Sequence, residues 1–509
     1  MKPHLVSDIL RTAARRWPDK PAIIDPDRRT TYRELQRGAS YVSEWLAGAG
    51  VVPGQRVMCA GESDSAMVAA LLGVLDYGAI IVPVHPATPR PAASSLVRDA
   101  APRALCVGAS GMCSFGALYD GPTLTLSTEE HYDHRGGDPS PRRASTQRLP
   151  PSAIAALMYT SGSTGPPRAV VCPHSSVVFS VDAISSVLRY GSEDIVLGTL
   201  PFSFDYGLYQ IFLTLRAGAT LVLASDASQV HLLPKLLRDH RISVLPTNPS
   251  TVLLLLRSGL LQRISLPTLR LVTSTGEVFP EPQIQRLQDL FPQARITPMY
   301  GLTECKRVSI CPPDVPARPP GTVGVPLPGT AVRVVDQEGR SMPPGEVGEL
   351  LVRGPHVMAG YWNAPEETAD RFRHGVDGER ELWTHDQFRQ DENGFLYFVG
   401  RSRSVIKSLG HRVGPSEVEN VINAVPWVVE SAVVGVPDPL RGEAVIAFVV
   451  ADSAAPIADL QSHCRAHLLS MACPVQFLLQ DSPLPRTRNG KVDHESLRAA
   501  ASKIYTAES

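Results

Sequence analysis

Apolar residues in the N-terminal part of the chain recur with two different spacings. Segments with helical spacing alternate with short continuous apolar runs, the clearest of them at 5–17, 66–75, 79–82, 269–273, 281–290 and 296–300. A turn at Asp76-Tyr77-Gly78 separates the second segment from the third. Helices that alternate with buried strands predict a layered α/β architecture.

The pattern changes from Ala331 onward, where short apolar runs are separated by glycine and proline. These runs predict strands at 332–335, 349–352 and 395–398, and therefore a β-rich subdomain. After Gly400 the pattern predicts a compact unit with a helix, two strands and a helix at 416–424, 431–436, 444–450 and 457–469. We expect a large α/β unit of several subdomains at 1–400 and a small α+β domain at 401–509.

Composition narrows the class of protein. The chain has 509 residues, of which 43% are hydrophobic and 19% charged, so it can bury more than one core. Its 49 basic and 50 acidic residues nearly cancel, which argues against nucleic acid as a partner.

The eight cysteines lack metal-ligand spacing and are expected to be buried thiols. Without a signal peptide or an apolar run that could span a membrane, a cytoplasmic location is expected. The Arg-, Pro-, Ser- and Gly-rich segment 131–151 predicts an exposed loop.

A segment rich in glycine and hydroxyl groups directly follows the apolar run 154–158. It reads Tyr159-Thr160-Ser161-Gly162-Ser163-Thr164-Gly165. The glycines allow successive backbone N–H groups to face an anion, and the hydroxyl groups add donors, so the segment fits a polyphosphate. A Ser/Gly cluster without such neighbours is more commonly a flexible surface loop, and the lysine of a P-loop is absent.

Further segments follow this one in a fixed order. They are Gly276-Glu277, Tyr300-Gly301-Leu302-Thr303-Glu304, Thr384-His385-Asp386, Gly400-Arg401, the stretch 406–413 with Ser408 and Gly410, and 485–492 with Lys491. Together with the Ser/Gly segment, they resemble the adenylate-forming superfamily, which includes acyl-CoA synthetases, adenylation domains of peptide synthetases and luciferases. The resemblance covers nearly the whole chain. It implies ATP, Mg²⁺ and coenzyme A as reactants, and a C-terminal domain that is mobile.

The resemblance also implies a role for each matched residue. Thr160 to Gly165 and Arg168 hold phosphates, Gly276 and Glu277 lie at the adenine, and Gly301 belongs to the adenine motif. Tyr300 stacks on the base, Thr303 contacts the α-phosphate, and Glu304 binds Mg²⁺. Asp386 and Arg401 contact the ribose, Lys491 promotes adenylation, and Ser408 and Gly410 line a thiol tunnel after the small domain rotates. The chain departs from the family at Arg168-Ala169, where Lys-Gly is usual, at His385, where Gly is usual, and at Arg403, where Asp or Lys is common at the hinge.

The acyl pocket is expected near Phe204, Asp205 and Gly207. An aspartate here resembles the one that pairs with the ammonium group in amino-acid-activating domains, but the segment also resembles free-standing acyl-CoA ligases. We predict an AMP-forming acyl-CoA synthetase for a hydrophobic acid. One alternative is an amino-acid ligase that loads a carrier protein in trans. Others are an enzyme limited to the thioester-forming half-reaction and a non-enzymatic binder. The oligomeric state stays open, with a homodimer as one option.

Overall fold

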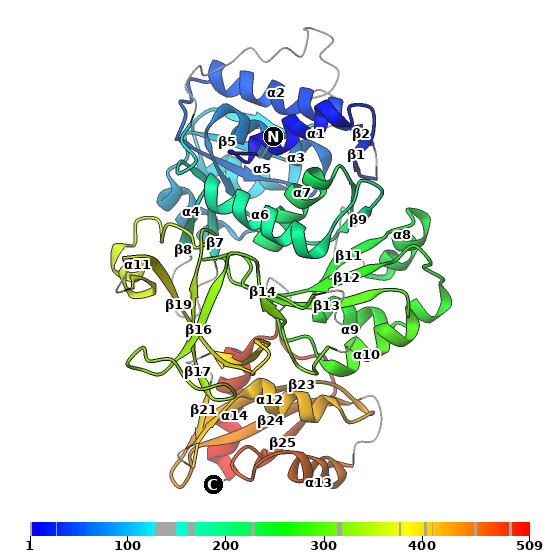
Figure 1. The fold of residues 1–509 in the computed structure, drawn as a ribbon, viewed down its shortest axis with the longest axis vertical. Helices are drawn as coiled ribbons and strands as arrows, with labels where there is room; N and C mark the ends of the chain where they lie inside the picture. The colour runs from blue at the N-terminus through cyan, green and yellow to red at the C-terminus, as the bar shows by residue number, and fades with distance from the viewer. Residues whose placement is uncertain are drawn as a thin grey trace.

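The molecule is elongated, with its N-terminus and C-terminus in opposite end layers (Figure 1). The computed structural model describes residues 3–26, 28–127, 149–160, 168–224, 230–312, 318–375, 378–401, 405–409, 411–451, 456–487 and 491–508. Its strands form four sheets, and the helices pack around them. The mixed α/β class predicted from the sequence is confirmed.

Two sheets form most of the N-terminal unit. The first has the order β6-β5-β3-β4-β7-β8 and is parallel except for its edge pair β7 and β8. Its strands are β3 (Arg56–Ala60), β4 (Ile80–Pro83), β5 (Ala104–Val107), β6 (Thr123–Thr125), β7 (Ile154–Thr160) and β8 (Arg168–Pro173). Associated helices are α1 (Ser7–Arg16), α2 (Tyr32–Gly48), α3 (Ser65–Tyr77), α4 (Arg90–Ala100), α5 (Ala109–Phe115) and α6 (His174–Leu188).

The second sheet has the order β15-β14-β13-β12-β11-β9-β10-β1-β2. Its strands are β1 (Pro21–Ile24), β2 (Arg29–Thr31), β9 (Ile195–Gly198), β10 (Thr220–Leu223), β11 (Val244–Thr247), β12 (Leu271–Ser274), β13 (Arg295–Tyr300), β14 (Ser309–Ile310) and β15 (Val325–Pro326). The helices that connect them are α7 (Asp205–Ala217), α8 (Leu233–Asp239), α9 (Pro249–Arg257) and α10 (Glu281–Leu290). Strands β9 to β13 are parallel, so their carboxyl ends meet at one edge.

A β-rich unit follows, as predicted. It contains β16 (Ala331–Val335), β17 (Val347–Arg353), β18 (Phe372–His374), β19 (Arg380–Gln390), β20 (Leu396–Arg401) and α11 (Pro365–Arg371). The C-terminal part contains β21 (Ile406–Ser408), β22 (His411–Val413), β23 (Val428–Asp438), β24 (Gly442–Ala451), β25 (Gln476–Gln480), α12 (Pro415–Asn423), α13 (Ile457–His467) and α14 (His494–Glu508). The stretch 406–413 includes β21 and β22, which pair with each other, and β21 also pairs with β24.

Local sequence signals explain where the main helices begin and end. Helix α2 starts at a capping box, because the Thr31 side chain accepts from the Glu34 N–H and the Glu34 carboxylate accepts from the Thr31 N–H. Helix α7 ends at Gly218, which has the left-handed conformation (φ 72°) that glycine adopts without strain.

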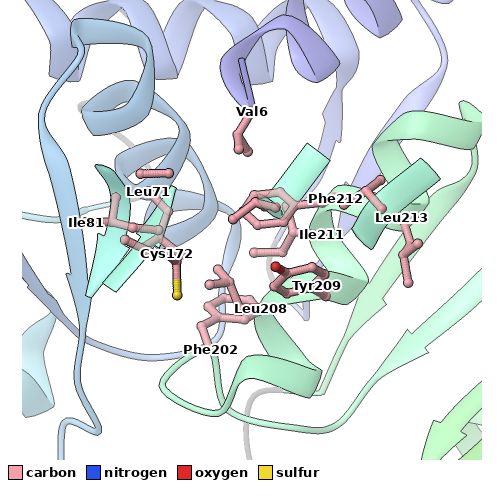
Figure 2. Close-up of a cluster of buried hydrophobic side chains, with 14 of the residues drawn as sticks. Val6, Leu71, Ile81, Cys172, Phe202, Leu208, Tyr209, Ile211, Phe212 and Leu213 are labelled. Atoms are coloured by element: carbon pink, nitrogen blue, oxygen red, sulfur yellow. The ribbon is translucent and has the colours of Figure 1, made fainter. Parts of the chain in front are cut away.

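Helix α7 lies within the main apolar core. Figure 2 shows its residues Leu208, Tyr209 and Phe212 near Val6 of the N-terminal segment and Cys172 of β8. Because the residues from Asp205 to Leu215 are all buried, the position of the first turn of α7 is fixed by packing on every side. The charged residue at its start, Asp205, is therefore held in the interior.

Several expectations about other regions have mixed outcomes. All eight cysteines are free thiols, but Cys113 is exposed and Cys473 half-buried, so burial was predicted correctly only for the other cysteines. Most of the predicted loop 131–151 lies outside the described residues, as does Arg403. The domain boundary near residue 400 stays a prediction. Among the described helices, none combines the length and the apolar composition that a membrane span requires.

Candidate active site

The tyrosine at the end of β13 and the aspartate in β19 form a buried pair. The Tyr300 hydroxyl donates to Asp386 Oδ2 at 2.6 Å, and Arg401 Nε lies 3.7 Å from Asp386 Oδ1. Burial raises the pKa of Asp386, and the nearby Arg401 guanidinium acts in the opposite direction. The residues that the resemblance assigns to adenine and ribose are thus neighbours, although they lie far apart in the sequence.

Glu304 follows strand β13 and is buried, and two side chains donate hydrogen bonds to its carboxylate. Its Oε1 accepts from Arg371 Nη1 at 2.8 Å and from the Tyr361 hydroxyl at 2.5 Å. No hydrogen bond to the other carboxylate oxygen is found among the described residues, so that oxygen fits a magnesium ion that arrives with a triphosphate. Within the same residues, no cluster of three His, Cys, Asp or Glu side chains could hold a metal ion.

The antiparallel pair β7–β8 carries the Ser/Gly segment at its tip. Thr160 and Arg168 face each other in register, and the Thr160 hydroxyl donates to the Arg168 carbonyl at 3.3 Å. Ser161, Gly162, Ser163, Thr164 and Gly165 lie outside the described residues. The Arg168 guanidinium pairs with Glu367 at 3.3 Å and lies 5.9 Å from the centre of the Tyr361 ring. Because Tyr361 also bonds to Glu304, the base of the predicted phosphate loop lies beside Glu304.

Lys491 extends from the C-terminal part into the N-terminal unit. Its Nζ lies 5.8 Å from the centre of the Phe204 ring. A Cβ atom at Gly276 would lie 3.7 Å from Lys491 Cε and 3.8 Å from Nζ, and Gly276 has a left-handed φ of 94° that suits glycine. Burial lowers the pKa of Lys491, Arg401 adds to this effect, and Glu277, Asp205 and Asp386 oppose it. The predicted catalytic lysine is therefore surrounded by predicted nucleotide and acyl residues.

A chain of polar contacts holds the Lys491 loop against the N-terminal unit. Arg486 donates to Ser250 Oγ and to Glu430 Oε2, each at 2.5 Å. Ser250 in turn donates to Glu277 Oε2 at 2.9 Å. The loop is closed by the Thr487 N–H, which donates to the Lys491 carbonyl at 2.7 Å. We call the contacts among Glu277, Ser250, Arg486 and Glu430 the docking contacts.

The first turn of α7 places Asp205 beside two further buried charges. Lys306 Nζ lies 3.3 Å from Asp205 Oδ1, and Lys306 and Arg307 are only 2% and 3% exposed. Arg307 Nη1 donates to Thr275 Oγ1 at 2.6 Å. Lys306 and Arg307 were not predicted as site residues, although they closely follow Glu304 in the sequence. Two adjacent basic residues before the buried segment 308–311 were the available signal.

Two predicted glycines have clear packing reasons. A Cβ atom at Gly207 would lie 2.4 Å from the Pro201 carbonyl oxygen, and one at Gly301 would lie 2.2 Å from the Lys306 carbonyl oxygen. Both distances are far below van der Waals contact, so the backbone requires glycine at these positions. The role of Gly207 in binding the acid stays a prediction.

Of the two predicted thiol-tunnel residues, the structure describes Ser408. Ser408 is buried in the C-terminal sheet, opposite His411 on one side and Gly442 on the other. Gly410 is outside the described residues. Thr303, the predicted α-phosphate contact, is half-buried and directly precedes Glu304 in the chain. Lys491, rather than Ser408, is therefore the predicted residue of the C-terminal domain that this arrangement brings to the nucleotide site.

Comparisons with known proteins show the family of the chain. The family described as AMP-binding enzyme matches residues 10–362, and the AMP-binding enzyme C-terminal domain matches residues 417–491. The chain is 30% identical to the fatty acid–[acyl-carrier-protein] ligase ScoC of Streptomyces coeruleorubidus over 507 residues, which cover 95% of this chain and 94% of ScoC.

Two solved structures are also similar. The anthranilate CoA ligase AuaEII in complex with anthranoyl-AMP has a TM-score of 0.89 at 25% identity, with 99% of this chain and 98% of AuaEII covered. The complex of VinN with L-aspartate has a TM-score of 0.68 at 36% identity, with 78% of this chain and 98% of VinN covered. The chain is a member of the AMP-binding enzyme family and, within it, an adenylate-forming ligase.

Proposed function

We propose that this ligase activates a carboxylic acid with ATP and transfers the acyl group to a thiol. The observation that supports this most directly is the position of Lys491, close to Phe204 and Gly276 and within electrostatic reach of Asp386. A carboxylate oxygen attacks the α-phosphorus of ATP, the bond to the β-phosphate oxygen breaks, and pyrophosphate leaves. The Lys491 ammonium group stabilises the charge that develops during this step.

In the second step the thiol sulfur attacks the carbonyl carbon of the acyl-AMP. The bond between the carbonyl carbon and the phosphate oxygen breaks, and AMP leaves with the electron pair while the thiol loses its proton. Glu304 is the residue that would hold a magnesium ion, which would neutralise part of the triphosphate charge. Tyr361 and Arg371 position Glu304 for this contact.

The acceptor thiol is the first open choice. ScoC is named as a ligase for an acyl carrier protein and matches the chain over nearly its full length, so a carrier protein in trans is our first candidate. Coenzyme A, which the sequence alone favoured, is the second, and AuaEII is named as a CoA ligase. Thioester formation with coenzyme A and with a phosphopantetheinylated carrier protein separates the two.

The chemistry of the acid is the second open choice. Asp205, Lys306 and Arg307 are buried charges at the predicted acyl pocket, and they favour a polar acid over the hydrophobic acid expected from sequence. VinN was solved with L-aspartate, an acid with an ammonium group and two carboxylates. An amino acid therefore stays a candidate substrate.

Exchange of labelled pyrophosphate into ATP, dependent on the added acid, tests the first step. Lys491→Ala should abolish this exchange and leave thioester formation from supplied acyl-adenylate intact. Lys235→Ala removes an exposed lysine of α8 and should leave both reactions unchanged. Equal loss of both reactions in Lys491→Ala would contradict the role given to this lysine. Thioester formation without exchange in the unmodified protein would instead support an enzyme of the second half-reaction only.

A further inference from the structure

The charges around Asp205 do not balance. Lys306 and Arg307 are two buried cations, and Asp205 is the carboxylate that pairs with one of them. Among the described residues, Lys306 Nζ and Arg307 Nε have no hydrogen-bond partner. The two neighbouring site carboxylates have cations of their own, because Glu304 pairs with Arg371 and Asp386 lies by Arg401. Within the part of the chain that the structure describes, one positive charge of this cluster is therefore left without a matching anion.

The backbone at Lys306 indicates that the cluster is more than incidental packing. Lys306 has a left-handed φ of 61°, which costs a residue with a side chain about 1–2 kcal/mol. Burial of an ion costs several kcal/mol more unless an oppositely charged partner offsets the lost hydration. Strain and desolvation that coincide at one residue beside a candidate site are typical of positions kept for function.

Aromatic rings hold the two cations in place without neutralising them. Lys306 Nζ lies 4.3 Å from the centre of the Tyr209 ring, and Arg307 Cζ lies 5.2 Å from the centre of the Tyr206 ring. The Tyr206 hydroxyl is fixed by Thr273 at 2.7 Å. Cation–π contacts orient a guanidinium or ammonium group but add no negative charge. The cations are thus positioned for an anion that the described residues do not supply.

The cluster adjoins the place where the acid reacts. Asp205 directly follows Phe204, whose ring lies 5.8 Å from Lys491 Nζ. The Arg307 guanidinium bonds to Thr275, and a Cβ atom at the next residue, Gly276, would lie 3.7 Å from Lys491 Cε. Asp205 is also close enough to Lys491 to act on its pKa, so the cluster and the lysine face the same part of the site.

We propose that Lys306 and Arg307 bind a second carboxylate of the acid, so that this ligase activates a dicarboxylic acid. The inference rests on the proposed function and names its substrate class. A second carboxylate balances the two cations against Asp205, whereas an aliphatic monocarboxylic acid leaves one buried charge uncompensated. An amino group on the same acid would have Asp205 as its partner.

Matched acids test the proposal through acid-dependent pyrophosphate exchange. At each chain length the full protein is given a dicarboxylic acid and its monocarboxylic counterpart, for example succinate and butyrate. The same comparison is repeated with an amino group present, using aspartate and 3-aminobutyrate. We expect kcat/KM to be about 10- to 100-fold higher for the dicarboxylic member of a pair, the range typical of a charge-assisted hydrogen bond. The comparison of succinate with aspartate shows whether the acid also carries an amine.

Two variants locate the effect. Arg307→Met and Lys306→Met should each lower exchange with the dicarboxylic acid by a similar factor and leave exchange with the monocarboxylic acid unchanged or increased. In either variant one buried cation remains to balance Asp205, so no uncompensated buried charge is created and both variants should fold, which thermal unfolding checks. Lys235→Met is the control for loss of a lysine in general. If Arg307→Met does not fold, Thr275→Val removes the hydrogen bond that orients Arg307 and should give a smaller loss in the same direction.

The outcomes separate this inference from the function on which it rests. Preference for monocarboxylic acids, or equal losses for both acids in the variants, would overturn the second-carboxylate site and leave the acid–thiol ligase intact. Absence of both exchange and thioester formation with every acid would instead remove the proposed function. Preference for dicarboxylic acids that both variants abolish supports the site.

Discussion

The backbone conformation at His385 makes any side chain at this position energetically unfavourable. The residue has a left-handed φ of 58°, at the position where the sequence resemblance expects glycine. Its side chain is partly exposed, and its N–H donates to Glu349 Oε1 at 2.9 Å, a bond that any residue except proline can make. The side chain at this position is therefore tolerated rather than required by the fold.

Replacement of His385 by Gly and by Ala isolates the effect of this angle. We expect His385→Gly to be more stable than His385→Ala by about 1 kcal/mol, because only alanine brings a Cβ atom into the left-handed region. Urea unfolding of the two variants measures the difference. Equal stability would show that the backbone relaxes to another conformation when the histidine is removed.

Lys306 gives the proposed substrate site a pH dependence. Burial lowers the pKa of Lys306 to about 7, Arg307 lowers it further, and Asp205 and Cys172 oppose the shift. Lys306 is therefore charged below this pKa and loses its proton as pH rises through it. We expect kcat/KM for the dicarboxylic acid to fall between pH 6 and 9, while the value for its monocarboxylic counterpart stays flatter. Lys306→Met should remove the difference between the two profiles, and a difference that persists would assign it to another group.

At the scale of elements, the loop between β25 and α14 brings Lys491 to the proposed site only while the docking contacts hold this loop against the N-terminal unit. Arg486 makes the docking contacts to Ser250 of α9 and Glu430 of β23, and Ser250 continues to Glu277. Glu277 is half-buried, and its pKa is raised by desolvation, with Ser250 and Lys491 acting against the shift. The same residues thus connect the predicted adenine turn to the lysine loop.

Arg486→Met should weaken this docking. We expect the rate of adenylation to fall by about 10- to 100-fold, the effect of losing hydrogen bonds to a charged group, while thioester formation from supplied acyl-adenylate stays unchanged. Arg498→Met is the matched control, because Arg498 pairs with Glu443 of β24, within the C-terminal part. A similar loss in both variants would point to general destabilisation of that part, which thermal unfolding would reveal.

Sequence patterns predicted the elements better than the contacts between them. Helix α10 begins and ends at the predicted residues, since its apolar spacing is regular and a proline stands before Glu281. Tyr300, Asp386 and Lys491 lie in short motifs that can be recognised locally. Glu430 lies in an ordinary strand, and no local pattern shows that it meets Arg486.

The site partners Tyr361 and Arg371 escaped prediction for the same reason. Each becomes informative only when the fold brings it to Glu304. Lys306 and Arg307 could be recognised in the sequence as two adjacent basic residues. Their burial, on which the proposed substrate site depends, is a property of tertiary packing. The residues predicted to take part in the reaction lie in local motifs. The residues proposed to select the acid depend instead on contacts between distant segments of the chain.

At the scale of the whole molecule, the proposed nucleotide site combines residues of the N-terminal unit with one loop from the C-terminal part. Tyr300, Asp386 and Glu304 belong to the former, and Lys491 belongs to the latter. A ligand that fills the site and contacts both parts should therefore stabilise the arrangement described here. A non-hydrolysable acyl-AMP analogue, with a sulfamate in place of the phosphate, is such a ligand.

We expect this analogue to raise the thermal unfolding temperature of the unmodified protein, because a ligand that binds only the folded state stabilises it by about 2.7 kcal/mol at a hundredfold excess over Kd. In Lys491→Ala the increase should be smaller, since the contact from the C-terminal part is lost. Lys235→Ala should behave like the unmodified protein. If Lys491→Ala showed the full increase, binding would depend on the N-terminal unit alone, and Lys491 would act only in the reaction step and not in holding the adenylate.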